Sequence, residues 1–220
     1  MLIIGSDGNI GRRYVSICKY LHIPYTAVDK RTNSEEDVCV EIEKNELILL
    51  CTPTDTHYEM IQKIIKIKKY KTSKTYLLCE KPITKSKNEL EKLLFDTVNS
   101  KITLFMVNNY NFIEIEPESN GIIKIFKKIV NDFTTEYNFY NSGSDGMIWD
   151  CIQLVYLAKG KILLKQESPI WHCKINGVKI SREQVDYSYI AMIIDFVTKR
   201  EKMWTLSDII KSHQKIMELI

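Results

Sequence analysis

The sequence lacks the features that mark a secreted, metal-binding or membrane protein. Its six cysteines form no CxxC pair, and most of them lie in apolar stretches, which predicts buried, reduced thiols in a cytoplasmic protein. The four histidines show no spacing typical of a metal site. No apolar run is long enough to cross a membrane, and no charged segment precedes an apolar one near Met1, so we expect neither a membrane span nor a targeting segment.

The chain also lacks a strong excess of charge. It has 31 Lys and Arg against 28 Asp and Glu, a net charge of +3, and the two signs are interleaved. This balance predicts no nucleic-acid partner and no membrane partner. Several lysines between residues 63 and 74 follow one helical stretch, and we expect them to form its solvated face. With 220 residues the chain can form one large domain or two small ones.

The first eleven residues contain the clearest motif. Four apolar residues predict a buried strand, glycines follow at positions 5, 8 and 11, and residues 12–20 have helical spacing. Strand, glycine turn and helix in this order are typical of a dinucleotide site. Gly5 would make the turn, Gly8 would let a pyrophosphate approach, and Gly11 would let the helix pack on the strand. The candidate cofactor contacts in this turn are Gly5, Asp7, Gly8, Asn9, Ile10 and Gly11.

The second expected strand, residues 25–29, ends in an acidic residue. Asp29 lies 24 residues after Gly5, close to the spacing at which an acid binds the ribose hydroxyls of adenosine. Lys30 and Arg31 come directly after it. They are either solvated turn residues or the holders of a 2′-phosphate, so the acid favours NAD and the two bases would permit NADP.

Strands and helices then alternate through the first half. Apolar runs at 46–51, 75–79 and 102–107 predict strands covered on both faces, and helical spacing is found at 58–70 and 84–98. Ser86 and Glu89 resemble a capping box. The inward residues of the second helix are predicted to be Leu90, Leu93, Leu94 and Val98. The predicted fold class is α/β, with a Rossmann-type, doubly wound parallel sheet over residues 1–107.

The second half has a different pattern. Strands are expected at 134–140, 162–165, 170–175 and 178–180, the last two joined by a hairpin at Asn176-Gly177. Helices are expected at 147–158, 185–199 and 205–220, and residues 122–130 could be either a helix or a strand. These elements predict a small α+β domain over residues 108–220 with a mainly antiparallel sheet.

Several motifs occur together in an order that resembles the Gfo/Idh/MocA family, the relatives of glucose–fructose oxidoreductase and inositol dehydrogenase. The most specific of them is Glu80-Lys81-Pro82 at the end of a strand. The other matching residues are the glycine triplet, Asp29, Cys51, Thr52, Pro53, His57, Glu59 and Cys79. The resemblance implies a nicotinamide cofactor, NAD or NADP. It also adds Cys51, Thr52, Pro53, His57, Glu80 and Lys81 to the cofactor contacts, with His57 structural or facing the cofactor rather than catalytic.

By the same resemblance, Lys81 would relay a proton to or from the reacting hydroxyl. Hydride leaves a carbinol carbon only as its oxygen loses a proton, so a base must be within reach. Asp150 matches the family's helical Asp beside the substrate, but Leu154 stands where the family commonly has His, with Gln153 as the nearest polar residue. Three alternatives follow. Lys81 could act alone or together with Asp150, or another group, Tyr110 or His172, could take the place of the missing His. Catalysis could also be lost.

The substrate side departs from the family in other ways. Tyr110 and Asn111 resemble the start of the family's second domain, but Asn111 stands where Arg is common. Trp149 belongs to the stretch that resembles the segment before the helical Asp. The second domain is short for the family, so the pocket would be shallow or completed by a second subunit. We expect a possible homodimer through the C-terminal sheet, and the last helix, about 205–220, is expected to return to the first domain.

Three functions are compatible with these residues. The first is an NAD(P)-dependent oxidoreductase acting on a secondary hydroxyl or ketone of a sugar, sugar nucleotide or cyclitol-like compound. The second is a dinucleotide-binding protein that has lost turnover, as Leu154 and Asn111 would allow. The third is a reductase of an imine or a related double bond. Substrate identity, reaction direction, the choice between NAD and NADP and the oligomeric state stay open at this point.

Overall fold

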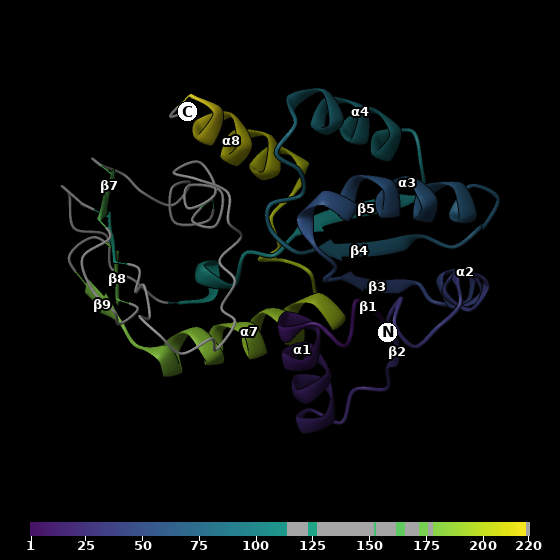
Figure 1. Ribbon diagram of the computed structural model, residues 1–220, viewed down its shortest axis with the longest axis horizontal. Helices are drawn as coiled ribbons and strands as arrows, with labels where there is room; N and C mark the ends of the chain where they lie inside the picture. The colour runs from purple at the N-terminus through teal and green to yellow at the C-terminus, as the bar shows by residue number, and fades with distance from the viewer. Residues whose placement is uncertain (114–122, 127–151, 153–161, 166–171, 176–177, 219–220) are drawn as a thin grey trace. The chain divides into compact units, whose positions relative to one another are not determined.

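A computed structural model of the chain describes residues 1–113, 123–126, 152, 162–165, 172–175 and 178–218 (Figure 1). The chain divides into two compact units. The first contains Met1–Val107 and Asp195–Ile209, and the second contains Asn108–Ile194 and Ile210–Ile220. We describe each unit by itself.

The first unit is built on a five-stranded sheet in the order β2-β1-β3-β4-β5. All neighbouring strands are parallel. The strands are β1 (Leu2–Ile4), β2 (Thr26–Val28), β3 (Leu47–Leu50), β4 (Thr75–Cys79) and β5 (Ile102–Met106). The predicted parallel α/β sheet of the first half is thereby confirmed.

Helices connect successive strands. They are α1 (Asn9–Tyr20), α2 (Glu35–Lys44), α3 (His57–Lys68) and α4 (Lys87–Val98), with a short 3-10 turn, η1 (Thr54–Thr56), before α3. α3 packs against both α2 and α4 and forms one layer with them. The step from β1 to β2 runs the opposite way along the sheet from the later steps, so right-handed crossovers put α1 on the other face. Figure 1 shows α3 and α4 side by side and α1 apart from them.

The strands form the centre of this unit's core, and helix residues such as Tyr14, Ile61 and Leu93 complete it. Leu2, Ile48, Leu49 and Leu77 are fully buried, as expected for parallel strands with both faces covered. The central strands β1 and β3 are continuous apolar runs because both of their faces are covered, whereas Ala27 of the edge strand β2 is exposed. Burying one such leucine or isoleucine side chain stabilises the fold by about 1.5–3 kcal/mol.

A late segment of the chain, Asp195–Ile209, belongs to this unit as well. Phe196 packs edge-on against Phe105 of β5, with ring centroids 6.3 Å apart. The Arg200 guanidinium lies 4.2 Å from the ring centroid of Tyr76 on β4, and Trp204 forms an antiparallel bridge with Met106. Two segments far apart in the sequence therefore share one core.

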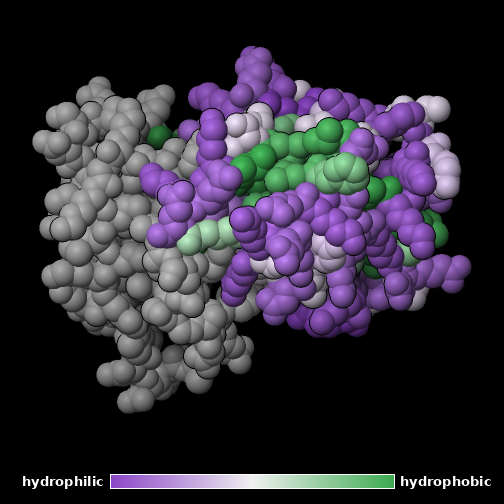
Figure 2. Space-filling model, turned by 90° about the horizontal axis from the view of Figure 1, so that it is seen from above, coloured by the Kyte–Doolittle hydropathy of each residue, from purple (hydrophilic) through white to green (hydrophobic). Residues whose placement is uncertain are grey.

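Helix α4 corrects two predictions. Val98 is 70% exposed, whereas Leu90, Leu93 and Thr97 are buried, because position 98 falls about 100° from the centre of the face that these three define. Figure 2 shows an apolar area over this helix among hydrophilic residues. The capping box is half formed: the Ser86 hydroxyl accepts from the N–H of Glu89, but the Glu89 carboxylate accepts from the Thr84 hydroxyl instead.

The lysine-rich helix α3 corrects a third prediction. Lys68 is 3% exposed rather than solvated. Its ammonium donates to the carbonyls of Glu43 at 3.0 Å and Asn45 at 2.7 Å, at the C-terminal end of α2. Burial and the charge of Lys71 lower the pKa of Lys68. This lysine therefore joins α3 to the end of α2.

Four strands and two helices of the second unit are described in part. The strands pair in the order β7-β6-β8-β9, with β6 parallel to β7 and antiparallel to β8, and β8 antiparallel to β9. The elements are η2 (Asn109–Phe112), β6 (Ile123–Phe126), β7 (Ile162–Lys165), β8 (His172–Ile175), β9 (Val178–Ile180), and most of α7 (Arg182–Val197) and α8 (Leu206–Met217). The expected strand 134–140 and helix 147–158 lie outside the described residues, apart from residue 152, so the architecture of this half stays a prediction.

Within the described ranges, none of the helices is both long enough and apolar enough to span a membrane.

We predict that Lys68→Met lowers the free energy of unfolding by about 1–3 kcal/mol, because it leaves two part-buried carbonyls without this donor while keeping the apolar stem. Urea unfolding followed by circular dichroism measures the change. Lys66→Met, at an exposed position of the same helix, is the matched control and should stay within about 0.5 kcal/mol of the wild type. Equal effects of the two changes would contradict the role of Lys68.

Candidate functional site

The carboxyl ends of four neighbouring strands carry most of the predicted site residues. Asp29 follows β2, Gly5 follows β1, Cys51 follows β3 and Glu80 follows β4. Backbone hydrogen bonds continue the sheet by one residue here: the N–H of Gly5 donates to Val28, that of Cys51 to Ile4 and that of Glu80 to Leu50, all at 2.8–2.9 Å. Positions far apart in sequence thus lie along one edge.

The strand order predicts a crevice at this edge. The chain leaves β1 toward β2 on one side and returns to β3 on the other side. Helices that leave neighbouring strands toward opposite faces open a crevice outside the carboxyl ends, and this is where open α/β sheets bind ligands. The ends of β1 and β3, at Gly5 and Cys51, flank that point.

The glycine turn has the geometry that the motif predicts. Gly5 has φ +87°, a conformation that residues with a Cβ rarely adopt. The N–H of Gly8 donates to the carbonyl of Gly5 at 3.2 Å and closes the turn. A Cβ on Gly11 would lie 2.1 Å from the Gly5 carbonyl oxygen, so only glycine lets α1 approach this closely. A Cβ on Gly8 would meet only that oxygen, at 3.4 Å, so the space beside Gly8 is open.

The N-terminus of α1 differs from that of the next helix. Its N-cap is Gly8, which supplies no side-chain cap, and no acidic residue lies in its first turn. By contrast, the Ser34 side chain caps α2 and forms a full capping box with Asp37. The first N–H groups of a helix have no partner within it and attract an anion. Asn9 is exposed and Ile10 is half-buried at this end, so the backbone there can meet a ligand.

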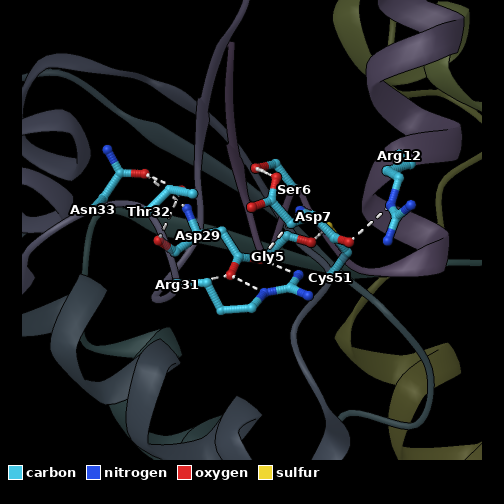
Figure 3. Close-up of polar contacts among 9 residues, drawn as sticks. All are labelled: Gly5, Ser6, Asp7, Arg12, Asp29, Arg31, Thr32, Asn33 and Cys51. Atoms are coloured by element: carbon cyan, nitrogen blue, oxygen red, sulfur yellow. Dashed lines mark hydrogen bonds and ion pairs between the residues drawn. The ribbon is translucent and has the colours of Figure 1, made fainter.

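Asp29 is the buried acid of the site (Figure 3). Its Oδ1 accepts from Nε of Arg31 at 2.8 Å, and its Oδ2 accepts from Nη2 of Arg31 at 3.1 Å and from the backbone N–H of Asp7 at 3.1 Å. The hydrogen bond from the Arg31 side chain is the main reason that the pKa of Asp29 falls to about 2. Asp29 is therefore ionised at neutral pH and joins β2 to the glycine turn, while Lys30 is exposed.

The end of β3 adds a buried thiol. Sγ of Cys51 donates to the carbonyl of Ile4 at 3.1 Å. Burial and the nearby Glu80 and Asp29 carboxylates raise the pKa of Cys51 well above its usual value, so the thiol stays protonated. Thr52 is half-buried, and its hydroxyl accepts from the Thr56 hydroxyl at 2.8 Å. Pro53 is exposed.

Glu80 is buried under the same edge. Its Oε1 accepts from the Tyr14 hydroxyl at 2.6 Å, and its Oε2 accepts from the backbone N–H of Lys81 at 3.1 Å. The carboxylate is thus directed toward Tyr14 of α1 and not toward a ligand at the edge of the sheet. Lys81 itself is half-buried, and the Lys81–Pro82 peptide bond is cis.

His57, the first residue of α3, is 1% exposed. Its Nδ1 lies 2.9 Å from the carbonyl oxygen of Pro82, and its Nε2 lies 2.8 Å from the carbonyl oxygen of Thr52. Burial lowers the pKa of His57 from its usual value, partly offset by these carbonyls and by the Glu80 carboxylate. The ring contacts the backbone of two neighbouring loops.

The predicted substrate residues belong to the second unit. Tyr110 and Asn111 lie in η2, and His172 begins β8. Trp149, Asp150 and Gln153 lie outside the described residues, as does Leu154. Within the described ranges, no three His, Cys, Asp or Glu side chains are grouped to hold a metal ion.

Comparisons with known proteins also indicate a dinucleotide-binding sheet in the first unit. Residues 16–109 match a family model described as an oxidoreductase family with an NAD-binding Rossmann fold. This segment of the chain is similar to the Gfo/Idh/MocA oxidoreductase family. The cofactor that this family model describes is NAD. The matched segment begins after the glycine turn, so the assignment of Gly5, Gly8 and Gly11 depends on the geometry above. A comparison with curated proteins finds no match.

Solved dehydrogenase structures share their fold with this chain. One is the WlbA dehydrogenase of Thermus thermophilus in complex with NAD and UDP-GlcNAcA, with 11% identity, TM-score 0.70, and 99% of this chain and 93% of that chain covered. A putative myo-inositol dehydrogenase of Sinorhizobium meliloti has 13% identity and TM-score 0.65, covering 100% and 97%. The UDP-N-acetylglucosamine 3-dehydrogenase of Acidithiobacillus ferrooxidans has 12% identity and TM-score 0.65, covering 99% and 94%.

Two residues of the site escaped the sequence analysis. Tyr14 donates to the buried Glu80, and Arg12 donates from Nε to the carbonyl of Asp7 at 2.9 Å, which holds the turn to α1. A polar atom on an otherwise buried helix face is the signal that could have identified Tyr14. No sequence pattern identifies the contact of Arg12, because its partner is a backbone carbonyl.

We predict that Asp29→Asn lowers the free energy of unfolding by at most about 2 kcal/mol at pH 7, less than the full pKa shift allows because Arg31 is half exposed. The folded-state pKa lies below the unfolded one, so the contribution of Asp29 is complete above about pH 4 and is lost as the pH falls toward 2.

The stability difference between wild type and Asp29→Asn should therefore shrink to near zero at pH 2, measured by urea unfolding at several pH values. Asp55→Asn, at an exposed position in η1, is the control and should change little. A difference between wild type and Asp29→Asn that does not depend on pH would contradict the ion pair.

Proposed function

We propose that the chain is an NAD-dependent dehydrogenase that acts on a secondary hydroxyl, or the matching ketone, of a sugar-derived substrate. The observation that carries this proposal is the uncapped N-terminus of α1 beside Asp29 at the end of β2. In a dinucleotide site, a helix N-terminus holds the pyrophosphate, and an acid at the end of the neighbouring parallel strand holds the adenosine ribose. The sugar-derived substrate is supported by relatives described as dehydrogenases of inositol and of UDP-sugars.

The residues present fit a dinucleotide. The backbone N–H groups of Asn9 and Ile10 would hold the pyrophosphate, with Gly8 open beside them. Asp29 would accept from the ribose hydroxyls. In the structure, the side chain and backbone N–H of Arg31 together with the N–H of Asp7 make four hydrogen bonds to its two oxygens. A carboxylate has about four acceptor sites, so the ribose would displace the more exposed donor, Arg31.

The same pair supports NAD over NADP. Asp29 is ionised, so it would repel a 2′-phosphate, and its charge offsets that of Arg31, the residue that would otherwise bind the phosphate. If Arg31 turned outward, it could still meet a phosphate at the surface. NAD is therefore the cofactor that we propose, with Arg31 as the residue that sets how strictly NADP is refused.

Lys81 would hold and move the proton. The cofactor, when bound, exchanges a hydride with the carbinol carbon of the substrate. As that carbon loses hydride, its hydroxyl must lose a proton, and Nζ of Lys81 would accept it. The backbone N–H of Lys81 donates to Glu80, and Glu80 in turn is held by Tyr14. This buried pair would fix the backbone from which the lysine side chain extends.

The second domain completes this proposal. We propose that residues 108–220 bind the substrate, with Tyr110, Asn111, Trp149, Asp150, Gln153 and His172 as candidate contacts. Asp150 would assist Lys81. The homodimer through the C-terminal sheet and the cytoplasmic location stay predictions.

A second function is favoured by one residue. Leu154 stands where the family commonly has His, so a dinucleotide-binding protein without turnover is the alternative. Such a protein would bind NADH but would oxidise no substrate. Reduction of an imine remains a variant of the first proposal, since it uses the same cofactor edge.

We predict that wild-type protein binds NADH, detected by the rise in cofactor fluorescence, and that Gly8→Val reduces this affinity at least about tenfold because its branched side chain fills the pyrophosphate space. Circular dichroism should show both proteins folded, since the space beside Gly8 is open. NADPH should bind more weakly than NADH. Normal NADH binding by folded Gly8→Val would overturn the assignment of the turn.

We predict that Lys81→Ala abolishes turnover on any sugar, sugar nucleotide or cyclitol that the wild type oxidises, followed as absorbance of NADH, while the affinity for NADH stays within a few fold. A lost base costs about 10²–10⁴-fold in rate. Lys85→Ala, at an exposed position nearby, is the control and should leave turnover unchanged. Turnover by Lys81→Ala at the wild-type rate would remove the proposed role, and absence of turnover in the wild type with normal NADH binding would favour the alternative function.

A further inference from the structure

The His57 ring makes an unusual pair of contacts. Both of its nitrogens face carbonyl oxygens, Pro82 O at 2.9 Å from Nδ1 and Thr52 O at 2.8 Å from Nε2. Carbonyl oxygens only accept, so each contact requires an N–H from the ring. A neutral imidazole has one N–H and a protonated one has two. The site thus offers the ring two acceptors that only a doubly donating group satisfies completely.

The two carbonyls belong to the loops after neighbouring strands. Thr52 follows β3, and Pro82 follows β4, directly after Lys81. β3 and β4 are paired in the sheet, in register from Leu47 to Leu50. The sheet itself ends at the hydrogen bond from Glu80 to Leu50, so beyond it the loops need another connection, and the His57 ring spans both of them.

Two buried side chains, His57 and Glu80, contact the Lys81–Pro82 segment. Glu80 is the charged side chain whose field raises the pKa of His57, whereas burial lowers it. The Glu80 carboxylate contacts the backbone N–H of Lys81 on one side of Pro82, and His57 contacts the carbonyl on the other side. The cis segment Lys81–Pro82 is therefore held at both ends by buried side chains.

We propose that His57 is a positioning residue that ties the Thr52 loop to the Lys81–Pro82 loop and so fixes Lys81 against the cofactor edge. The role in catalysis rests on the proposed function, because it assumes that Lys81 moves the proton. The tie between the loops does not rest on it. In this role, His57 acts through the backbone carbonyls of Thr52 and Pro82 and not through the side chain of Lys81.

The test compares two variants of the full-length chain. His57→Leu keeps the volume and removes both donors, whereas His57→Gln keeps one donor nitrogen, which can reach only one of the two carbonyls. We expect His57→Leu to lower kcat by about 10²-fold, the cost of a misplaced catalytic group, with Kd for NADH within a few fold. His57→Gln should recover part of kcat, because it restores one of the two contacts. His22→Asn, at an exposed histidine with positive φ, is the control and should match the wild type.

A second measurement separates this role from the proposed activity. Amide hydrogen exchange reads the loops directly: His57→Leu should lose protection in residues 51–56 and 80–84 together, His57→Gln should retain it in only one of these two segments, and the strands should stay protected in both. Unchanged exchange in His57→Leu would overturn the tie whether or not the wild type has activity. If exchange follows the prediction but the wild type oxidises nothing, the proposed function fails and the tie stands. Equal kcat in Leu and Gln variants that both remain folded would overturn the positioning role.

Discussion

The close approach of α1 to the turn after β1 is the constraint on which the rest of the site depends. Position 11 has no room for a Cβ, because that atom would lie 2.1 Å from the carbonyl oxygen of Gly5. The turn that makes this approach possible has positive φ at Gly5. With α1 docked this closely, its N-terminus opens at the same edge as the ends of β2 and β3. A nucleotide site here is a consequence of how strand and helix pack.

A layer of buried polar groups lies under this edge. Tyr14 and the N–H of Lys81 hold the Glu80 carboxylate, and Arg31 and the N–H of Asp7 hold that of Asp29. Buried charges without partners would cost several kcal/mol. Each carboxylate is instead bonded to the backbone of the loop that it supports. These buried contacts fix the loops at the edge of the sheet, as a preorganised binding site requires.

Much of the first unit follows from the sequence, because strands covered on both faces must be continuous apolar runs and a glycine is required where no Cβ fits. Long-range polar contacts do not follow in this way. Tyr14 and Glu80 are 66 residues apart, and Lys68 reaches a carbonyl 25 residues away. A lysine in a lysine-rich helix looks solvated until the neighbouring helix end is placed beside it. Val98 was misplaced because the inward face of α4 is centred one position earlier.

The most direct test of the central claim is a crystal structure of the chain with NAD. The account predicts electron density for the pyrophosphate within hydrogen-bond distance of the N–H groups of Asn9 and Ile10. It also predicts a ribose hydroxyl on Asp29, with the Arg31 side chain turned away from it. Clear density for the cofactor at any other edge of the sheet, or Asp29 still closed by Arg31 beneath a bound adenosine, would contradict the account.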